Sequence, residues 1–181
     1  SGLSDVKQVS CGYYHSLFLL EDGTLYVTGM NSYGQLGLGN TTNRNTPTLV
    51  SGLSDEKQVS GGKYHSLFLL EDGTVYATGY NHWGELGLDD TTQRNAPTLI
   101  SSLSNVEYVN GSYSYSIYLL EDGSVYVNGD NGYGQLGLGD NTDRNTPTFV
   151  SSLSGVKQVI GGSYHSLFLL EDGTVYATGY N

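Results

Sequence analysis

Three of the four histidines, His15, His65 and His165, occupy the same place in a repeated pattern, which raises the question of a zinc site. Tyr115 stands at the fourth such place. Zinc binds imidazole nitrogens at about 2.0 Å, and side chains that belong to separate repeat units cannot converge on one ion at that distance. We therefore expect buried histidines that hydrogen-bond the backbone, a role in which a tyrosine keeps a ring and a polar tip.

Paired carboxylates are the strongest charge signal. Each unit carries a Glu-Asp-Gly turn, and the turns contain Glu21, Asp22, Glu71, Asp72, Glu121, Asp122, Glu171 and Asp172. Because the units repeat, all four turns should emerge on one face as an acidic rim. This rim is either a solvated edge that resists aggregation or a polyvalent site for a basic partner or divalent cations. Glycosidase chemistry is disfavoured, because an exposed turn lacks the apolar pocket that raises the pKa of a general acid.

A glycine-rich stretch at 34–39 has the composition of a phosphate-binding loop and returns in phase at 84–89 and 134–139. It lacks the lysine of a P-loop, and no helix is expected after it to face a phosphate. These features exclude a P-loop or a dinucleotide site. We expect turns between units instead, with Leu36 and Leu38 as plugs into the core.

The next loop, at 40–45, is rich in Asn and Thr. Its third copy has aspartates at both ends of 140–143, a weak calcium-binding pattern, but Asn43 and Gln93 replace the second aspartate in the other copies. We therefore expect a hydrogen-bonded loop and no metal site. Three arginines in phase should bind local carbonyls or carboxylates: Arg44, Arg94 and Arg144.

Aromatic side chains recur just before this glycine-rich stretch. Tyr33, Trp83 and Tyr133 share one place in the repeat, and His82 precedes the tryptophan. Aromatic residues on a surface favour contact with a protein or a sugar. Packing between units is the alternative, and the sequence leaves both open.

Overall composition narrows the class of protein. The net charge is −11, with 18 acidic against 7 basic residues, which opposes binding to nucleic acid or to anionic lipid. No run of 18 apolar residues is present, so we expect no membrane insertion. Cys11 is the only cysteine and stands where other units have glycine, so we expect a small residue filling that place and no catalytic or metal-binding role. We find no constellation of an enzyme and expect no cofactor.

The chain repeats with a period of 50 residues and no gaps. We read 1–181 as a single array with units 1–50, 51–100, 101–150 and 151–181, the last incomplete. A fixed period of this length is typical of solenoids, propellers and arrays. The chain begins at Ser1 and not at Met, so we expect a processed product or a segment of something longer.

Each unit predicts four strands, which in the first unit are 6–10, 15–20, 24–29 and 46–50. Pro47 cannot donate to a sheet ladder, so the last strand should lie at an edge. Residues 17–20 are apolar on both faces, so this strand must be covered on both sides. An isolated sheet cannot achieve that, whereas a sheet stacked between neighbours can. We therefore predict an all-β fold of β-propeller-type blades with four antiparallel strands, in a closed ring or a stacked array.

Two runs in each unit give a family resemblance. One extends from Gly12 to Gly29 with its His-Ser, Asp-Gly and Tyr elements, and the other from Asn31 to Gly39 before Thr46-Pro47. Together they resemble the regulator of chromosome condensation repeat, over essentially the whole chain. The resemblance implies a β-propeller, usually of seven blades. The tryptophan common in that repeat is replaced here by Thr28, Thr78, Asn128 and Thr178.

The resemblance also implies two kinds of function. The founding family member is a nucleotide exchange factor on chromatin, which acts through loops and a basic surface that this acidic sequence does not show. Other relatives are bacterial surface or secreted proteins, including a propeller inhibitor of β-lactamases. We therefore expect a non-enzymatic module for assembly or adhesion outside a bacterial cell. An intracellular regulator or protein-interaction propeller resembling the exchange-factor branch is the alternative, as is an inhibitor or lectin.

The partner is expected to be a protein, including a second copy through the blade faces, and a sugar is a weaker candidate. Units without polar caps would expose apolar faces at both ends of the array. Three arrangements would cover them: a small four-bladed ring, two chains in a larger ring, or a longer repetitive protein or polymer. We expect an extracellular or cell-surface location, with the cytoplasm as the alternative.

Overall fold

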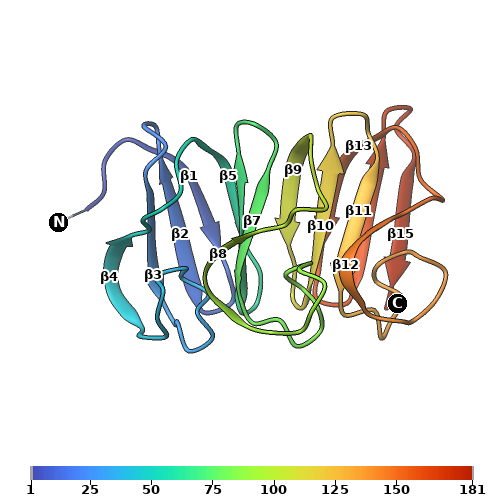
Figure 1. The fold of residues 1–181 in the computed structure, drawn as a ribbon. Helices are drawn as coiled ribbons and strands as arrows, with labels where there is room; N and C mark the ends of the chain where they lie inside the picture. Colours follow the sequence, from blue (N-terminus) through green and yellow to red (C-terminus); the bar gives the residue numbers. More distant parts are fainter. Residues whose placement is uncertain (1, 181) are drawn as a thin grey trace.

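The computed structural model describes residues 2–180 and consists of four antiparallel sheets that stand side by side along the chain (Figure 1). We call the sheets blades 1 to 4. Blade 1 contains β1 (Val6–Cys11), β2 (His15–Leu20), β3 (Leu25–Gly29) and β4 (Arg44–Leu49). Blade 2 contains β5 (Glu56–Gly61), β6 (His65–Leu70), β7 (Val75–Gly79) and β8 (Arg94–Leu99). Blade 3 contains β9 (Val106–Gly111), β10 (Tyr115–Leu120), β11 (Val125–Gly129) and β12 (Arg144–Phe149). Blade 4 contains, within the described range, β13 (Val156–Gly161), β14 (His165–Leu170) and β15 (Val175–Gly179).

Strand order within each blade follows the chain, as in β1-β2-β3-β4, so the predicted all-β architecture is confirmed. The proline-bearing strand β4 lies at an edge of its sheet, where the missing N–H of Pro47 costs no ladder hydrogen bond. The hairpin between β2 and β3 turns at Gly23, which has a φ of 80° that favours glycine. None of the described elements is a helix of the length and apolarity needed to cross a bilayer.

The first strands of the blades, β1, β5, β9 and β13, lie next to one another, and we call them the inner strands. Side chains connect them through backbone groups. The amide of Gln8 donates to Val59 O at 2.9 Å and accepts from Val59 N at 3.0 Å. The hydroxyl of Ser10 accepts from Gly61 N at 3.1 Å. Gly61 must be small, because a Cβ there would lie 2.6 Å from Gly12 N of the preceding blade.

The hydrophobic core lies between blades, in three clusters that each combine two neighbouring blades. The side of a blade that faces the next one carries residues such as Leu17 and Leu19, and the side that faces the preceding one carries residues such as Val59 and Phe68. We call these the leading and trailing faces. In β6 and β10 both faces are buried, which confirms the predicted two-sided coverage. Each such side chain contributes about 1.5–3 kcal/mol on burial.

The long loop after β3 closes the gap between blades. Its amide at Asn31 is fully buried, donates to Asn40 O and Thr42 O, and accepts from Leu36 N at 2.9 Å. Leu36 is fully buried and the partly buried Leu38 packs against the same cluster, so both are the plugs that the sequence predicts. Arginines of these loops bind local oxygens, also as predicted: Arg94 donates to Asp90 and Arg144 to Asp140.

Candidate functional site

The phased histidines lie between blades and do not form a site. The Nε2 of His15 is 2.8 Å from Ser66 Oγ, and that hydroxyl donates to Gln35 O at 2.7 Å. His65 repeats this arrangement with the next blade. The expected backbone partner was therefore wrong, because the ring reaches the neighbouring blade's serine first. Burial lowers the pKa of His15 to about 4 and that of His65 to about 3, so both rings are neutral near pH 7.

Tyr115 fills the histidine place in blade 3, and its hydroxyl donates to His165 O at 2.6 Å. It therefore keeps the structural role that the sequence predicts for it. His165 itself is exposed on the leading face of blade 4. Within residues 2–180, no group of three His, Cys, Asp or Glu side chains is placed to hold a metal ion.

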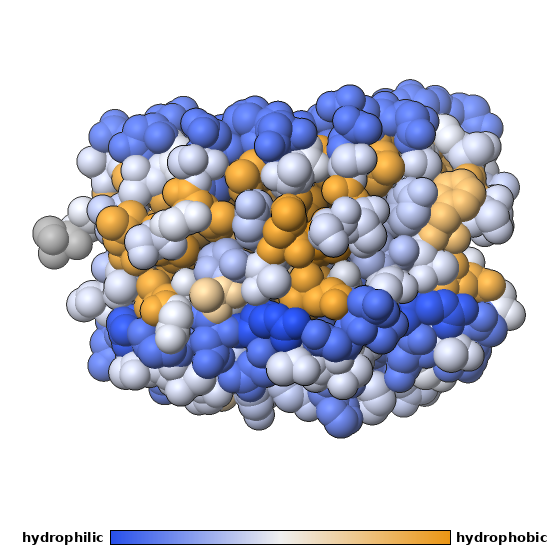
Figure 2. Space-filling model, viewed as in Figure 1, coloured by the Kyte–Doolittle hydropathy of each residue, from blue (hydrophilic) through white to orange (hydrophobic). Residues whose placement is uncertain are grey.

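The acidic turns all lie at one end of the blades, which is the upper, hydrophilic edge in Figure 2. Each aspartate has a local role, since Asp22 accepts from Thr24 N at 2.9 Å and the same bond recurs at Asp72, Asp122 and Asp172. These bonds from Thr or Ser lower the pKa of all four aspartates. The glutamates of the turns are exposed. A binding role for this rim stays a prediction.

The opposite end of the blades carries a surface of aromatic rings. Pairs of ring centroids 4.8–6.2 Å apart connect these rings in a nearly continuous series across all four blades. We call it the aromatic face, and its members are Tyr13, Tyr14, Tyr33, Tyr64, Tyr80, His82, Trp83, Tyr113, Tyr133, Tyr164 and Tyr180.

The loop aromatics predicted from the sequence both pack between blades and reach solvent. Tyr33 lies 4.9 Å from Tyr64 and 4.8 Å from Tyr80 of the next blade, measured between ring centroids. Tyr133 meets Tyr164 at 5.0 Å and Tyr180 at 5.2 Å in the same way, yet it is 49% exposed. Neither of the two alternatives for these residues is therefore complete by itself.

The middle junction breaks this pattern. Ser114 and Asp130 stand where the other junctions place the two tyrosines of the following blade. Trp83 therefore has no aromatic partner on blade 3, and its ring contacts His82 at 4.9 Å while 40% exposed. The indole is thus the most isolated large ring on the aromatic face.

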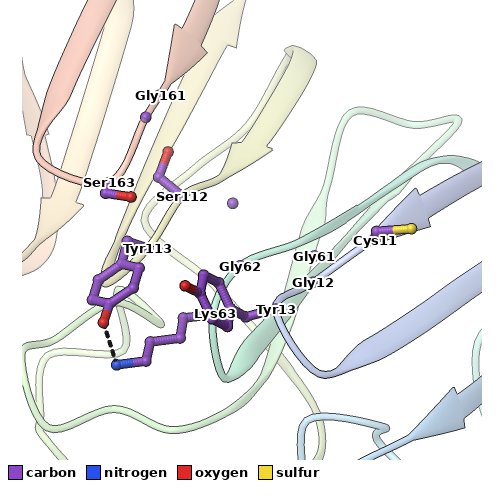
Figure 3. Close-up of a pocket in the computed structure, with 12 residues that line it drawn as sticks. Cys11, Gly12, Tyr13, Gly61, Gly62, Lys63, Ser112, Tyr113, Gly161 and Ser163 are labelled. Atoms are coloured by element: carbon purple, nitrogen blue, oxygen red, sulfur yellow. Dashed lines mark hydrogen bonds between the residues drawn. The ribbon is translucent and has the colours of Figure 1, made fainter.

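Lys63 supplies a cation to the aromatic face. Its Nζ lies 4.1 Å from the ring centroid of Tyr113 and 4.8 Å from that of Tyr64, and it donates to the Tyr113 hydroxyl at 2.6 Å (Figure 3). The ammonium lowers the pKa of Tyr113. The ends of the inner strands form an open depression of about 280 Å³ beside this pair, lined by glycines, Tyr13 and Ser112 among others.

Sequence reasoning missed Lys63 and the tyrosines at the ends of the inner strands. A signal was present, because Tyr14, Tyr64 and Tyr164 are in phase and the chain contains 16 tyrosines. A phase relationship alone does not say that residues from different places in the repeat meet on one surface. The blade stacking brings positions such as 33 and 64 together.

A buried carboxyl lies directly beneath Trp83. Glu85 is 2% exposed, and its Oε2 accepts from Trp83 N at 2.8 Å. Burial raises the pKa of this carboxyl to about 8, and the nearby charges of Asp130 and Asp143 add to the rise. Gln35 and Gln135 make the same bond to Tyr33 and Tyr133 without a charge.

Comparison with known families decides the classification. The model of the "Regulator of chromosome condensation (RCC1) repeat" matches residues 22–69, 72–119 and 122–169, and a second model of that repeat matches 6–35, 57–84 and 106–135. The chain belongs to the RCC1 repeat family. The predicted recognition is thereby confirmed, together with the propeller-type blades that it implies.

Curated relatives match one stretch of about a unit. The E3 ubiquitin-protein ligase MYCBP2 of Danio rerio is 51% identical over 43 residues, which is 24% of this chain and 1% of the relative. The human X-linked retinitis pigmentosa GTPase regulator is 50% identical over 46 residues, which is 25% of this chain and 4% of the relative. The chain therefore spans a small part of these proteins, and the match concerns their RCC1-type repeat.

Solved structures match nearly the whole chain. Human WBSCR16 superposes with a TM-score of 0.87 at 30% identity, over 97% of this chain and 47% of that one. Yeast RCC1 (Prp20), solved with bound Kap60, superposes with a TM-score of 0.86 at 23% identity, over 99% of this chain and 45% of that one. The four blades thus correspond to about half of each of these proteins. The shared feature is the RCC1-type propeller blade.

Proposed function

We propose that this chain is a non-enzymatic protein-interaction module that docks partners on its aromatic face. The observation that supports this is the aromatic face itself, with Lys63 held between tyrosine rings. Tyrosine and tryptophan are enriched among the residues that dominate protein–protein binding energy, because they bury a large area at a low entropy cost. Tyr13 and Tyr14 are 62% and 51% exposed, so this area is open to a partner.

The comparisons favour the same class of function. Yeast RCC1 (Prp20) was solved bound to Kap60, and Prp20p of Saccharomyces cerevisiae was studied for binding to Gsp1p and histones. These relatives support a protein as partner and therefore the protein-interaction alternative over an extracellular assembly or adhesion module. An extracellular or cell-surface location stays a prediction, with the cytoplasm as its alternative, and so does a sugar ligand.

Charge distribution suggests what such a partner presents. The aromatic face carries Lys63, whereas the acidic turns lie at the far end of the blades. A partner with apolar side chains and a carboxylate or carbonyl acceptor would match the tyrosine rings and the ammonium. A strongly basic partner would instead be drawn to the acidic end. The two faces therefore make opposite predictions for the site of binding.

We expect peptides selected from a random display library to bind the aromatic face. Changing Lys63→Ser together with Tyr113→Ser should weaken the selected peptides at least about tenfold, or about 1.4 kcal/mol. Serine is tolerated there, because Ser163 occupies the same place in blade 4. The matched control is Glu21→Gln with Glu71→Gln in the acidic turns, which should leave the affinity unchanged. Loss of binding in the control variant alone would instead place the site on the acidic rim.

Self-association through the blade faces is a second candidate function, and exposure at the two ends of the array favours it. Val9 on the trailing face of blade 1 is 64% exposed, while the equivalent Val59 is fully buried. Val175 on the leading face of blade 4 is 60% exposed, while Val75 is fully buried. Apolar faces of this kind associate in water. Sedimentation velocity from about 1 to 100 µM should show species of at least two chains, and a monomer throughout would contradict this candidate.

A further inference from the structure

The three internal junctions share one set of contacts between a leading and a trailing face. A glutamine of the inner strand bridges to the next blade's backbone at two of them, as Gln8 does to Val59 and Gln58 to Val109. A Ser or Asn two residues later accepts from the next blade's glycine N–H at all three: Ser10–Gly61, Ser60–Gly111 and Asn110–Gly161. This repetition defines what a fourth junction of the same kind requires.

Blade 4 presents a leading face with those features. Residues 164–180 are identical in sequence to 64–80, whose leading face is buried against blade 3. Gln158 stands at the place of Gln8 and Gln58, whereas blade 3 has Tyr108 there. His165 stands at the place of His15 and is exposed, so its ring is available for a serine hydroxyl.

Blade 1 presents the complementary trailing face. Val9, which the glutamine would bridge, is 64% exposed, and Ser16 stands at the place of Ser66, the serine that receives His15. Phe18 stands at the place of the fully buried Phe68. The two open faces are therefore the two halves of one further junction.

A paired departure from the repeat marks the same contact. At the internal junctions a Ser or Asn faces a glycine, and a Cβ on Gly61 or Gly111 would come within 2.6 or 2.9 Å of a backbone nitrogen of the preceding blade. The two ends carry Ile160 in place of the Ser or Asn and Cys11 in place of the glycine. Ile160 is 52% exposed, and Cys11 is free and exposed. A polar pair at close approach is thus replaced on both sides by an apolar pair that needs wider spacing.

We propose that blade 4 of one copy docks head-to-tail on blade 1 of a second copy, with Ile160 of the first copy against Cys11 of the second. This proposal rests on the self-association candidate above and adds its geometry. Such a contact joins unlike faces, so it either closes a ring or extends as a polymer. Because four blades correspond to 47% of human WBSCR16, two copies would together supply about one full ring of that type.

A single substitution tests the geometry, because Cys11 is the only native cysteine. In the Ile160→Cys variant, mild oxidation with diamide should link the introduced thiol of one copy to Cys11 of another. Mass spectrometry of the linked peptides identifies the bond, and a non-reducing gel gives its yield. We expect at least about tenfold more of this bond than in the control Ser104→Cys, whose thiol is exposed on blade 3 away from both end faces. Adding Cys11→Ser should abolish it.

Several outcomes separate this geometry from self-association in general. Bonds only between two introduced thiols, or a yield no higher than in Ser104→Cys, would overturn the head-to-tail contact even if sedimentation shows a dimer. A monomer in sedimentation would overturn both proposals. Leu167→Asp, on the open leading face, should shift the association at least about tenfold toward monomer, and circular dichroism should show that the blades still fold. A closed dimer and an open polymer both fit the contact.

Discussion

Replacing Glu85 with glutamine should stabilise the fold by about 2–3 kcal/mol at pH 8 and remove most of its loss of stability above neutral pH. Burial raises the pKa of this carboxyl from 4.5 to about 8. Below pH 4.5 the folded and unfolded chains both hold the proton. Between pH 4.5 and 8 only the folded chain holds it, so stability falls as pH rises. Such a pKa difference corresponds to about 4–5 kcal/mol at most.

The expected gain is smaller than this linkage for a visible reason. The side-chain nitrogens of Gln35 and Gln135, in the same place, are buried and have no hydrogen-bond partner in the described structure. A glutamine at 85 would leave the same nitrogen unpaired, at a cost of about 1–3 kcal/mol. Even so, two of the three units with this loop place glutamine there, so the variant should fold like its neighbours.

Urea unfolding of the Glu85→Gln variant and of the wild type at pH 5, 6.5 and 8 checks this prediction. The wild-type curve should have its maximum near pH 6.5. Below that value the unfolded histidines bind protons that buried His15 and His65 do not, so stability is lost as pH falls toward their folded pKa values of about 4 and 3. Glu71→Gln, in an exposed turn, is the control and should follow the wild type. Equal wild-type stability at pH 6.5 and 8 would contradict the assignment.

Strand positions and blade stacking could be predicted because they depend on patterns that the backbone imposes. Residues 17–20 are apolar on both faces, which requires neighbours on both sides, and Pro47 excludes a central strand. Leu36 could be assigned to the core because an apolar residue among turn glycines has few other uses. Each of these inferences uses residues within one unit.

Contacts between units were harder to predict. The partner of His15 is a serine 51 residues away, and the ring of Tyr33 meets Tyr64 of the next blade. A repeat with a period of 50 places every such pair in phase, but the phase does not show which two side chains touch. The aromatic face arises from the spacing and twist of neighbouring blades, so only the structure reveals it.

Departures from the repeat were the sequence signal that deserved more weight. Glu85 replaces Gln, Cys11 replaces Gly, and Glu56 replaces Val, each in one unit of a nearly identical series. In a repeat array, neighbouring units supply nearly the same surroundings, so a change of chemistry in one unit marks a local cost or a local contact. The structure shows that both glutamates are buried.

Replacing Glu56 with valine should stabilise the chain by about 3 kcal/mol at pH 7 and raise Tm by roughly 6–12 °C. Glu56 is 2% exposed, and its Oε2 has no hydrogen-bond partner in the described structure. Val106 and Val156 occupy the same place and belong to the apolar clusters between blades. A valine would remove an unsatisfied polar atom and add apolar burial, which contribute about 1–3 and 1.5–3 kcal/mol.

The dependence on pH separates the two contributions. Burial, with a smaller effect of Asp55, raises the pKa of Glu56, so stability that is present below pH 4.5 is lost as pH rises toward the folded pKa. At pH 4 the carboxyl is protonated in both states, and the gain from Glu56→Val measured there reflects packing and the lost hydrogen bond alone. The additional gain at pH 7 is the cost of ionisation. Glu121→Val, in an exposed turn, should change stability by less than about 0.5 kcal/mol at either pH. A gain from Glu56→Val no larger than that of the control would mean that water reaches the Glu56 carboxyl and that this junction between blades is not dry.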